Sequence, residues 1–129
     1  MLTPTLKVLV VDDDKLSRIA HMTILKSLGC EVDIATDGYQ ALAVWKNGFD
    51  IIFTDIDMPG LSGVDVTKTI RSFAHNISVS QPVIIGITAN LDVRTDCFAA
   101  GMHDVWKKPI SKKQVEQIIA KLERRKSSD

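Results

Sequence analysis

Residues 49–60 read FDIIFTDIDMPG, an apolar run that ends in carboxylates and then in a Pro-Gly turn. The continuous apolar run is typical of a strand that is buried on both faces. Side chains two residues apart on a strand point the same way, so Asp55 and Asp57 are expected to lie on one side of the strand end. Two carboxylates this close repel each other unless a positive group lies between them. The stretch therefore predicts a buried strand whose end needs a cation.

Short apolar runs alternate with amphipathic segments along the rest of the chain. Strands that alternate with helices form parallel sheets through right-handed crossovers, with helices on both faces. The pattern predicts a doubly wound, flavodoxin-like α/β fold with five parallel strands in the order 2-1-3-4-5 and five helices. The predicted strands are residues 7–11, 31–35, 49–55, 82–88 and 103–106, and the predicted helices are residues 16–28, 38–46, 64–73, 91–100 and 111–126.

The first predicted helix carries apolar residues at helical spacing, which predicts the face that it buries. That face is expected to comprise Leu16, Ile19, Ala20, Ile24, Leu25 and Leu28. Asp14 is expected to cap the start of this helix, and Gly29 is the expected residue just past its end. The last predicted helix opens with a capping box that runs from Ser111 to Gln114.

Length and composition indicate one globular domain over residues 1–129, with its core over about residues 6–125. Sixteen basic and sixteen acidic residues give a net charge of zero, which argues against nucleic-acid binding or anionic-membrane contact by this domain. No apolar run reaches the length of a membrane span, and the N-terminus lacks a signal-peptide pattern. Cys30 and Cys97 lack metal-ligand spacing, so we expect free thiols and a cytoplasmic location.

Chemically active side chains follow the predicted strands at their carboxyl ends. Asp12 and Asp13 follow the first strand, Asp55 ends the third, Thr88 ends the fourth, and Lys108 comes just after the fifth. In the predicted strand order these ends share one crevice, where such folds bind ligands. Clustered carboxylates suit Mg²⁺, and the metal, a lysine and a hydroxyl could together hold a phosphoryl group. Each residue alone has an ordinary structural explanation, but the combination predicts a phosphoryl site.

These motifs resemble those of response-regulator receiver domains in two-component phosphorelay systems. The matching stretches are VLVVDDDKLSR, the D-x-x-M-P of DIDMPGLSG, the ITA of residues 87–89, and KKPI, and the resemblance covers about residues 6–125. The longer stretches DIDMPGLSGVDVTKTIR, IIGITAN and AAGMHDVWKKPIS are most similar to receiver domains of hybrid sensor histidine kinases. The ending ERRKSSD, without an output domain, would fit an excised or free-standing receiver.

The resemblance implies that Asp55 accepts a phosphoryl group from a histidine of a kinase or of a histidine phosphotransfer domain. It also implies that Asp13 and Asp55 ligate Mg²⁺ directly, together with the backbone carbonyl of Asp57, and that Asp12 acts through water. Such a domain catalyses its own phosphorylation and slow dephosphorylation. It is therefore not an enzyme that acts on a separate substrate.

The resemblance also implies roles for residues that end or follow the fourth and fifth predicted strands. Thr88 would donate a hydrogen bond to the phosphoryl group, Lys108 would form an ion pair with it, and Pro109 would follow a cis peptide bond. Many receivers carry Tyr or Phe three residues before the lysine, where it swings inward on phosphorylation. Here that switch position is Val105, and the aromatic residue, Trp106, is expected on the opposite face of the strand.

The start of the first helix lies beside the predicted acidic site, so its outward residues are expected to meet the phosphodonor. The docking residues predicted there are Lys15, Ser17, Arg18 and His21, together with the segment after Lys108. The competing interpretation is a polar helix face that is simply solvated.

Two other classes of protein fit part of the sequence. A haloacid-dehalogenase-like phosphatase would use Asp55 and Asp57 as nucleophile and acid, although that family carries this motif on its first strand. A flavodoxin-like docking module without phosphoryl chemistry would give no Mg²⁺-dependent response to a phosphoryl mimic. Nucleotide binding is disfavoured, because no Gly-rich loop follows the first strand.

Overall fold

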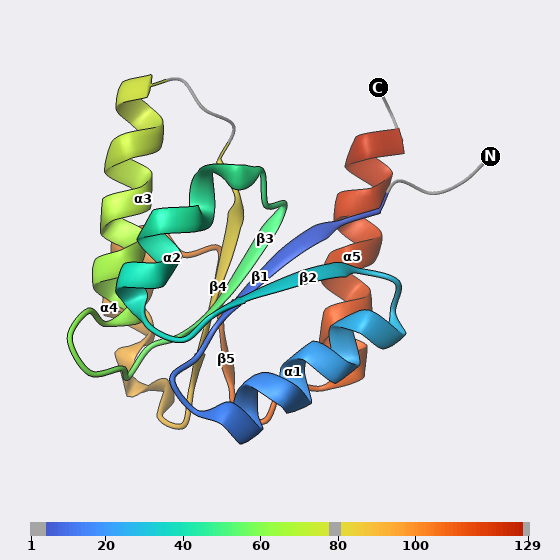
Figure 1. The fold of residues 1–129 in the computed structure, drawn as a ribbon, viewed down its shortest axis with the longest axis horizontal. Helices are drawn as coiled ribbons and strands as arrows, with labels where there is room; N and C mark the ends of the chain where they lie inside the picture. Colours follow the sequence, from blue (N-terminus) through green and yellow to red (C-terminus); the bar gives the residue numbers. More distant parts are fainter. Residues whose placement is uncertain (1–4, 78–80, 128–129) are drawn as a thin grey trace.

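A computed structural model describes residues 5–77 and 81–127 of the chain. Its centre is a five-stranded parallel sheet in the order β2-β1-β3-β4-β5, which confirms the predicted topology (Figure 1). The strands are β1 (Lys7–Val11), β2 (Glu31–Ala35), β3 (Ile51–Asp55), β4 (Val83–Thr88) and β5 (Asp104–Lys107).

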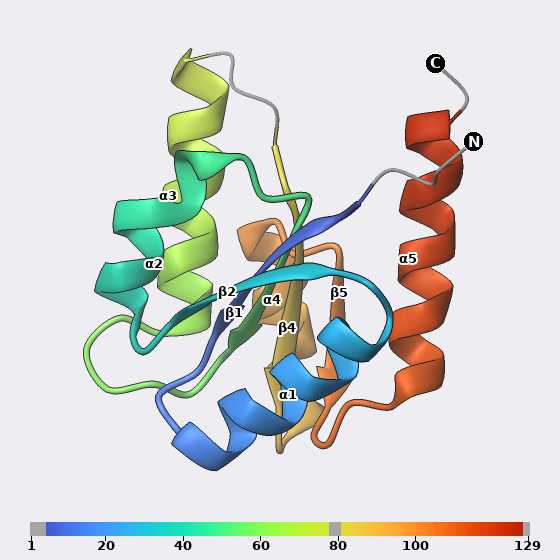
Figure 2. The same ribbon diagram turned by 45° about the vertical axis from the view of Figure 1, so that its right-hand side comes forward.

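Helices cover both faces of the sheet (Figures 1 and 2). α1 and α5 lie on one face, and α2, α3 and α4 lie on the other, because each crossover between parallel strands is right-handed. The helices are α1 (Lys15–Ser27), α2 (Gly38–Val44), α3 (Gly63–Ile77), α4 (Arg94–Ala100) and α5 (Lys112–Ser127), and short 3₁₀ turns, η1 (Trp45–Asn47) and η2 (Leu91–Val93), follow α2 and precede α4. Within the described ranges, no helix has both the length and the apolar character needed to cross a bilayer.

The central strands are apolar throughout because their side chains enter two separate cores. On β1, Val8 and Val10 pack in the core beneath α1 and α5, whereas Leu9 and Val11 pack in the core beneath α2, α3 and α4. Each such side chain contributes about 1.5–3 kcal/mol when it is fully buried. β2 forms an edge of the sheet, and its apolar content is accordingly lower, as predicted.

The predicted helix caps are present. The Asp14 carboxylate accepts a hydrogen bond of 2.8 Å from the Ser17 amide at the start of α1. At the start of α5, Gln114 N donates to Ser111 Oγ and Ser111 N donates to Gln114 Oε1, both at 3.1 Å, which completes the capping box. These caps fix where α1 and α5 begin, next to the strand ends.

The predicted buried face of α1 is partly wrong. Three of the six apolar residues expected in the core are exposed: Leu16, Ile19 and Ala20. Leu16 is 77% exposed and Ile19 is 44% exposed. The helix instead turns His21 and Leu25 inward, with Arg18 half-buried on the same side. The physical reason is that the first turns of α1 lie against the polar end of β1, so their inward positions are polar.

Val105 and Trp106 point to opposite faces of β5, as strand alternation predicts. Val105 is buried in the core beneath α2, α3 and α4, and Trp106 packs in the core beneath α1 and α5. The Trp106 ring lies 5.6 Å from the ring of Phe53, centroid to centroid, and its indole nitrogen donates to Asp104 Oδ2 at 2.9 Å.

The orientation of α1 can be tested by truncating one inward and one outward leucine. Leu25→Ala should lower the free energy of unfolding by about 2–5 kcal/mol, because it leaves a cavity in a packed core. Leu16→Ala should change it by no more than about 0.5 kcal/mol, because Leu16 is exposed. Urea unfolding followed by circular dichroism measures both values, and equal losses would mean that the helix is rotated relative to this structure.

Candidate functional site

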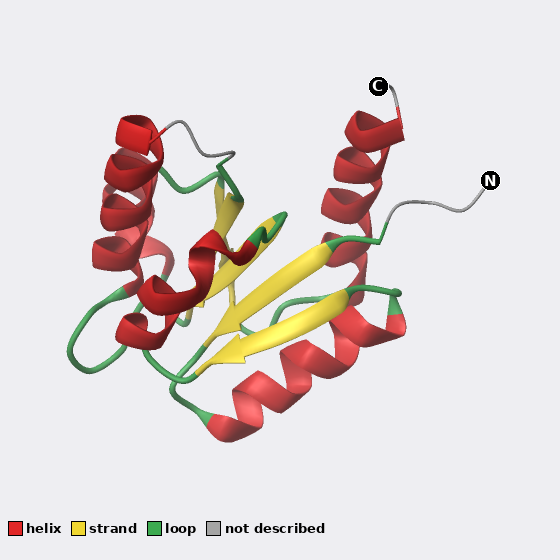
Figure 3. Ribbon diagram, turned by 45° about the horizontal axis from the view of Figure 1, so that its top comes forward, coloured by secondary structure: helices red, strands yellow, loops and turns green. Residues whose placement is uncertain are grey.

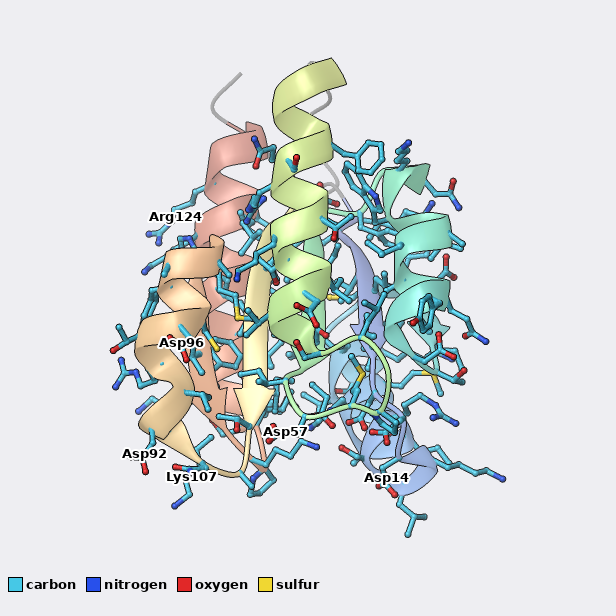
Figure 4. All side chains as sticks on the ribbon, turned by 90° about the vertical axis from the view of Figure 1, so that its left-hand side faces the viewer. Asp14, Asp57, Asp92, Asp96, Lys107 and Arg124 are labelled. Atoms are coloured by element: carbon cyan, nitrogen blue, oxygen red, sulfur yellow. The ribbon has the colours of Figure 1, made fainter. Side chains whose placement is uncertain are left out.

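Polar side chains gather at the carboxyl ends of the strands, the edge at which parallel α/β sheets bind ligands. Asp55 and Thr88 are the last residues of β3 and β4, Asp12 and Asp13 directly follow β1, and Lys108 directly follows β5. All five strands are parallel and run toward this edge, as the two arrows nearest the viewer show (Figure 3). Figure 4 shows Asp14, Asp57 and Lys107, which are close to these residues in the sequence, at the same end of the molecule.

Three carboxylates form a cluster that could hold a metal ion. Asp12, Asp13 and Asp55 each offer an oxygen, and these oxygens lie within 4.8 Å of one another. Asp12 and Asp55 are buried, whereas Asp13 is exposed to solvent. Carboxylate oxygens with access to water match the chemistry of Mg²⁺, which prefers oxygen ligands and keeps several waters. The donor set therefore fits this cation.

Asp12 is held in place by hydrogen bonds at both its backbone and its side chain. Its amide donates to the Ala35 carbonyl at 3.1 Å, and its carbonyl accepts from Arg18 Nη1 at 2.8 Å. Its Oδ1 accepts from the Asp14 amide at 2.9 Å. The remaining oxygen, Oδ2, is directed at Lys108, whose Nζ lies 3.7 Å away.

Lys108 supplies the positive charge that the clustered carboxylates require. Its Nζ donates to Asp55 Oδ2 at 3.1 Å, and the lysine side chain is about a quarter exposed. Burial raises the pKa of Asp55 above its ordinary value, and Lys108 opposes that rise. Burial acts to lower the pKa of Lys108, but its contacts with Asp55 and Asp12 outweigh this effect and raise that pKa. The lysine therefore stays charged next to both acids.

Asp57 lies outside the carboxylate cluster, which corrects the expectation that its side chain converges with that of Asp55. β3 ends at Asp55, so the alternation of a strand does not continue to Asp57, whose side chain is exposed. The backbone of Asp57 does face the site, because its amide donates to Asp55 Oδ1 at 3.3 Å.

The Thr88 hydroxyl is engaged by the loop that follows β4. It donates to the Asn90 carbonyl at 3.1 Å and accepts from the Asn90 amide at 3.1 Å. The Thr88 carbonyl accepts from the Lys108 amide at 2.8 Å, and the peptide bond between Lys108 and Pro109 is cis, as the resemblance implied. Asn90 was not singled out from the sequence, because only the folded loop brings its backbone to Thr88.

His21 does not lie on the outward face of α1, so that part of the predicted docking surface is wrong. It is 4% exposed, and its Nδ1 lies 4.0 Å from Asp12 Oδ2 with no hydrogen-bond partner among the described residues. Burial lowers the pKa of His21; the nearby Asp12 opposes this effect and Lys108 reinforces it. Arg18 is also turned inward by its bond to Asp12, whereas Lys15 is exposed and Ser17 is half-buried. The spacing of Arg18, His21 and Leu25 was the signal available in the sequence.

Comparison with protein families assigns residues 8–120 to the response regulator receiver domain. Among curated proteins, "Hybrid signal transduction histidine kinase L" of Dictyostelium discoideum is 38% identical over 121 residues, which cover 89% of this chain. The chain spans only 7% of the length of that relative.

Solved structures of receiver domains have the same fold. The receiver domain of Saccharomyces cerevisiae Ssk1, in a co-crystal with the histidine phosphotransfer protein Ypd1, matches with a TM-score of 0.82 and 25% identity, over 92% of this chain and 89% of the other. The receiver domain of Pseudomonas aeruginosa sensor histidine kinase PA1611, with magnesium coordinated in its active-site cleft, matches with a TM-score of 0.79 and 30% identity, over 92% of this chain and 97% of the other.

Mg²⁺ binding to the carboxylate cluster can be measured through stability. At a concentration about 100 times its Kd, Mg²⁺ should raise the free energy of unfolding by about 2.7 kcal/mol. Asp13→Ala should abolish most of that increment, because it removes one of the clustered carboxylates. Asp14→Ala is the matched control: it should cost about 1 kcal/mol through loss of the helix cap, yet keep the Mg²⁺ increment. Urea titrations with and without Mg²⁺ would contradict this assignment if both variants lost the increment equally.

Proposed function

Because the chain belongs to the response regulator receiver family of two-component systems, we propose that Asp55 is the carboxylate that accepts a phosphoryl group. The observation that carries this proposal is the environment of Asp55. It is buried at the end of β3, Lys108 Nζ lies 3.1 Å from its Oδ2, and oxygens of Asp12 and Asp13 lie within 4.8 Å of one of its own. Among the described carboxylates of the cluster, Asp55 lies nearest to the lysine, at 3.1 Å against 3.7 Å for Asp12.

The proposed reaction is transfer from a phosphorylated histidine to Asp55. A carboxylate oxygen of Asp55 attacks phosphorus, the P–N bond breaks, and the imidazole nitrogen leaves with the electron pair. An acyl phosphate results. In a separate, slow hydrolysis, water attacks phosphorus, the P–O bond to Asp55 breaks, inorganic phosphate is released and the Asp55 carboxylate is regenerated. The domain thus modifies itself and, under this proposal, turns over no separate substrate.

The attack is opposed by repulsion between the Asp55 carboxylate and the phosphoryl oxygens, which the site must offset. Lys108 would exchange its bond with Asp55 for one to a phosphoryl oxygen. The Thr88 hydroxyl would exchange the Asn90 carbonyl, 3.1 Å away, for another phosphoryl oxygen. Asp13 and Asp55 would hold Mg²⁺ directly with the Asp57 carbonyl, and Asp12 would hold it through water. The bound cation would neutralise charge on the phosphoryl group.

The partner that we propose is a histidine kinase, a histidine phosphotransfer domain, or both. The phosphodonor histidine must approach Asp55 past the start of α1, where Leu16 and Ile19 are exposed beside Lys15. This apolar stripe replaces the inward-facing His21 in the docking surface, because a side chain that is 4% exposed cannot contact a partner. Exposed apolar groups rimmed by polar ones are typical of protein-binding surfaces.

We also propose that the protein is located in the cytoplasm. The two free thiols, Cys30 and Cys97, agree with that location.

Two rival functions receive less support. A haloacid-dehalogenase-like phosphatase needs a second carboxylate as general acid, and the Asp57 side chain is exposed and outside the cluster. A docking module without phosphoryl chemistry gives no reason to bury Asp12 and Asp55 beside Lys108, since buried charges are costly unless paired.

The proposed acceptor is tested with a small phosphodonor. Incubation with acetyl phosphate and Mg²⁺ should add one phosphoryl group to the wild-type chain, and base should remove it. Asp55→Asn should gain none, because an amide oxygen is a much weaker nucleophile. Intact-mass spectrometry reads both results. A phosphatase would instead release phosphate over many turnovers, and a phosphorylated Asp55→Asn variant would disprove the assignment.

The proposed docking surface is tested with a histidine donor. Ile19→Glu should slow phosphotransfer from phosphorylated histidine phosphotransfer domains, Ypd1 among those tried, by about tenfold or more, the effect of losing one significant interface contact. Its rate with acetyl phosphate should not change. Phe73→Glu is the matched control, because Phe73 is also exposed but lies on α3, on the opposite face of the sheet. Equal slowing with both donors would mean that the substitution damages the site itself.

A further inference from the structure

The corner between β2 and α2 (residues 36–39) packs against the loop that follows β3 (residues 57–62). Gly38 is buried, and a β-carbon at this position would lie 2.7 Å from Leu61 Cβ and 3.0 Å from the Leu61 carbonyl oxygen. It would also lie 2.9 Å from Val66 Cγ2. These distances are too short for non-bonded atoms, so a side chain at residue 38 would have to displace Leu61 or Val66. The missing side chain of Gly38 is therefore what allows the corner to contact the 57–62 loop.

Tyr39 makes the second contact between the corner and the loop. Its side chain is 63% exposed, yet a β-carbon at Gly60 would lie 3.1 Å from Tyr39 Cε2. Gly60 has a φ of 82°, so the chain turns there in a conformation that favours glycine. The tyrosine ring thus covers the turn of the 57–62 loop, although it contributes little to the core.

The corner itself is held firmly. Gln40 N donates to Asp37 Oδ1 and Thr36 N donates to Gln40 Oε1, both at 2.8 Å. These two reciprocal hydrogen bonds cap the start of α2 in the manner of a capping box. Just before the corner, the Ala35 carbonyl accepts from the Asp12 amide at 3.1 Å. The corner therefore joins the end of β1, which carries Asp12, to the loop after β3.

The 57–62 loop is fixed at its ends by short-range contacts. Its first amide, of Asp57, donates to Asp55 Oδ1 at 3.3 Å, and after its last residue Gly63 N donates to the Ile56 carbonyl at 3.0 Å. Between these points, Gly60 and Leu61 lie against the corner. A shift of the corner would therefore be transmitted to the loop that bears the Asp57 carbonyl.

We propose that Gly38 and Tyr39 are positioning residues that hold the 57–62 loop in the conformation in which the Asp57 carbonyl binds a divalent cation. Neither residue touches the cation or the phosphoryl group. The inference rests on the proposed function, which makes that carbonyl a ligand. It adds that the affinity for Mg²⁺ is set partly by a contact that lies away from the carboxylates.

The test is the Kd for Mg²⁺, measured by isothermal titration calorimetry on the whole chain. Tyr39→Ala should raise this Kd about tenfold, the effect commonly seen when a group that orients a metal ligand is lost. Tyr39→Phe should keep the Kd within about twofold of wild type, because the ring contact with Gly60 remains. Tyr39 is exposed, so neither variant should shift the urea midpoint of unfolding measurably.

Gly38→Ala and Gly48→Ala form a matched pair for the buried contact. Gly48 has a φ of 94° and nothing within 4 Å of a β-carbon, so alanine there strains the backbone at the other end of β3 without displacing a neighbour. Gly38→Ala should raise the Kd for Mg²⁺ about tenfold. Gly48→Ala should lower the urea midpoint and leave the Kd unchanged.

Three results separate the possible failures. If wild type and Tyr39→Ala bind Mg²⁺ equally well, the positioning role is wrong and the proposed function stands. If Gly48→Ala weakens binding as much as Gly38→Ala, general loss of stability explains the effect and the positioning role is again wrong. If the wild-type chain itself binds no Mg²⁺ and accepts no phosphoryl group, the proposed function fails and this inference fails with it.

Discussion

Repulsion among Asp12, Asp13 and Asp55 is the constraint around which the rest of this domain is organised. Three carboxylates with oxygens within 4.8 Å of one another, two of them buried, cannot remain charged together without a neighbouring cation. In this structure the cation is Lys108, 3.1 Å from Asp55 and 3.7 Å from Asp12. The lysine comes from the far end of the sequence. The site can therefore form only after β5 has joined the sheet beside β4.

Burial of Asp55 adds to this repulsion and gives the site its chemical capacity. Burial raises the pKa of Asp55, so the folded protein holds this carboxylate in an environment that disfavours its charge. A group that brings positive charge, or that shares Lys108, is then bound more readily than it would be by an exposed aspartate. The arrangement favours a reaction in which charge is neutralised as the phosphoryl group arrives. Stability is weakened locally where function requires it.

Much of the fold could be predicted because its signals are local. Continuous apolar runs marked the central strands, and the polar residues that follow them marked the ligand-binding edge. The rotation of α1 could not be predicted from the apolar pattern, because Leu16 and Ile19 are apolar yet exposed. Arg18 and His21 occupy the inward positions because Asp12 lies beneath them. A helix whose first turns lie against a polar site need not place all its apolar residues in the core.

Contacts made by the loops could likewise not be predicted from the sequence. The role of Gly38 depends on how closely Leu61 approaches it, and residues 23 positions apart carry no local pattern that reveals this contact. The engagement of Thr88 by Asn90 is similar in kind, since it depends on the path of the loop after β4. In both cases the sequence shows which residues are present. The distances between them, on which their roles depend, are set only when the chain folds.

The position of the aromatic residue on β5 bears on how far a change at the site can spread. Val105 is buried and β-branched, so it has little rotameric freedom with which to follow a movement of Thr88. Trp106 lies on the other face, packed against Phe53 and bonded to Asp104, and is not adjacent to the space beside Thr88. A ligand shifts a conformational equilibrium only through contacts that differ between the two states. With the usual aromatic contact absent, rearrangement is favoured in the loops at the strand ends rather than along β5.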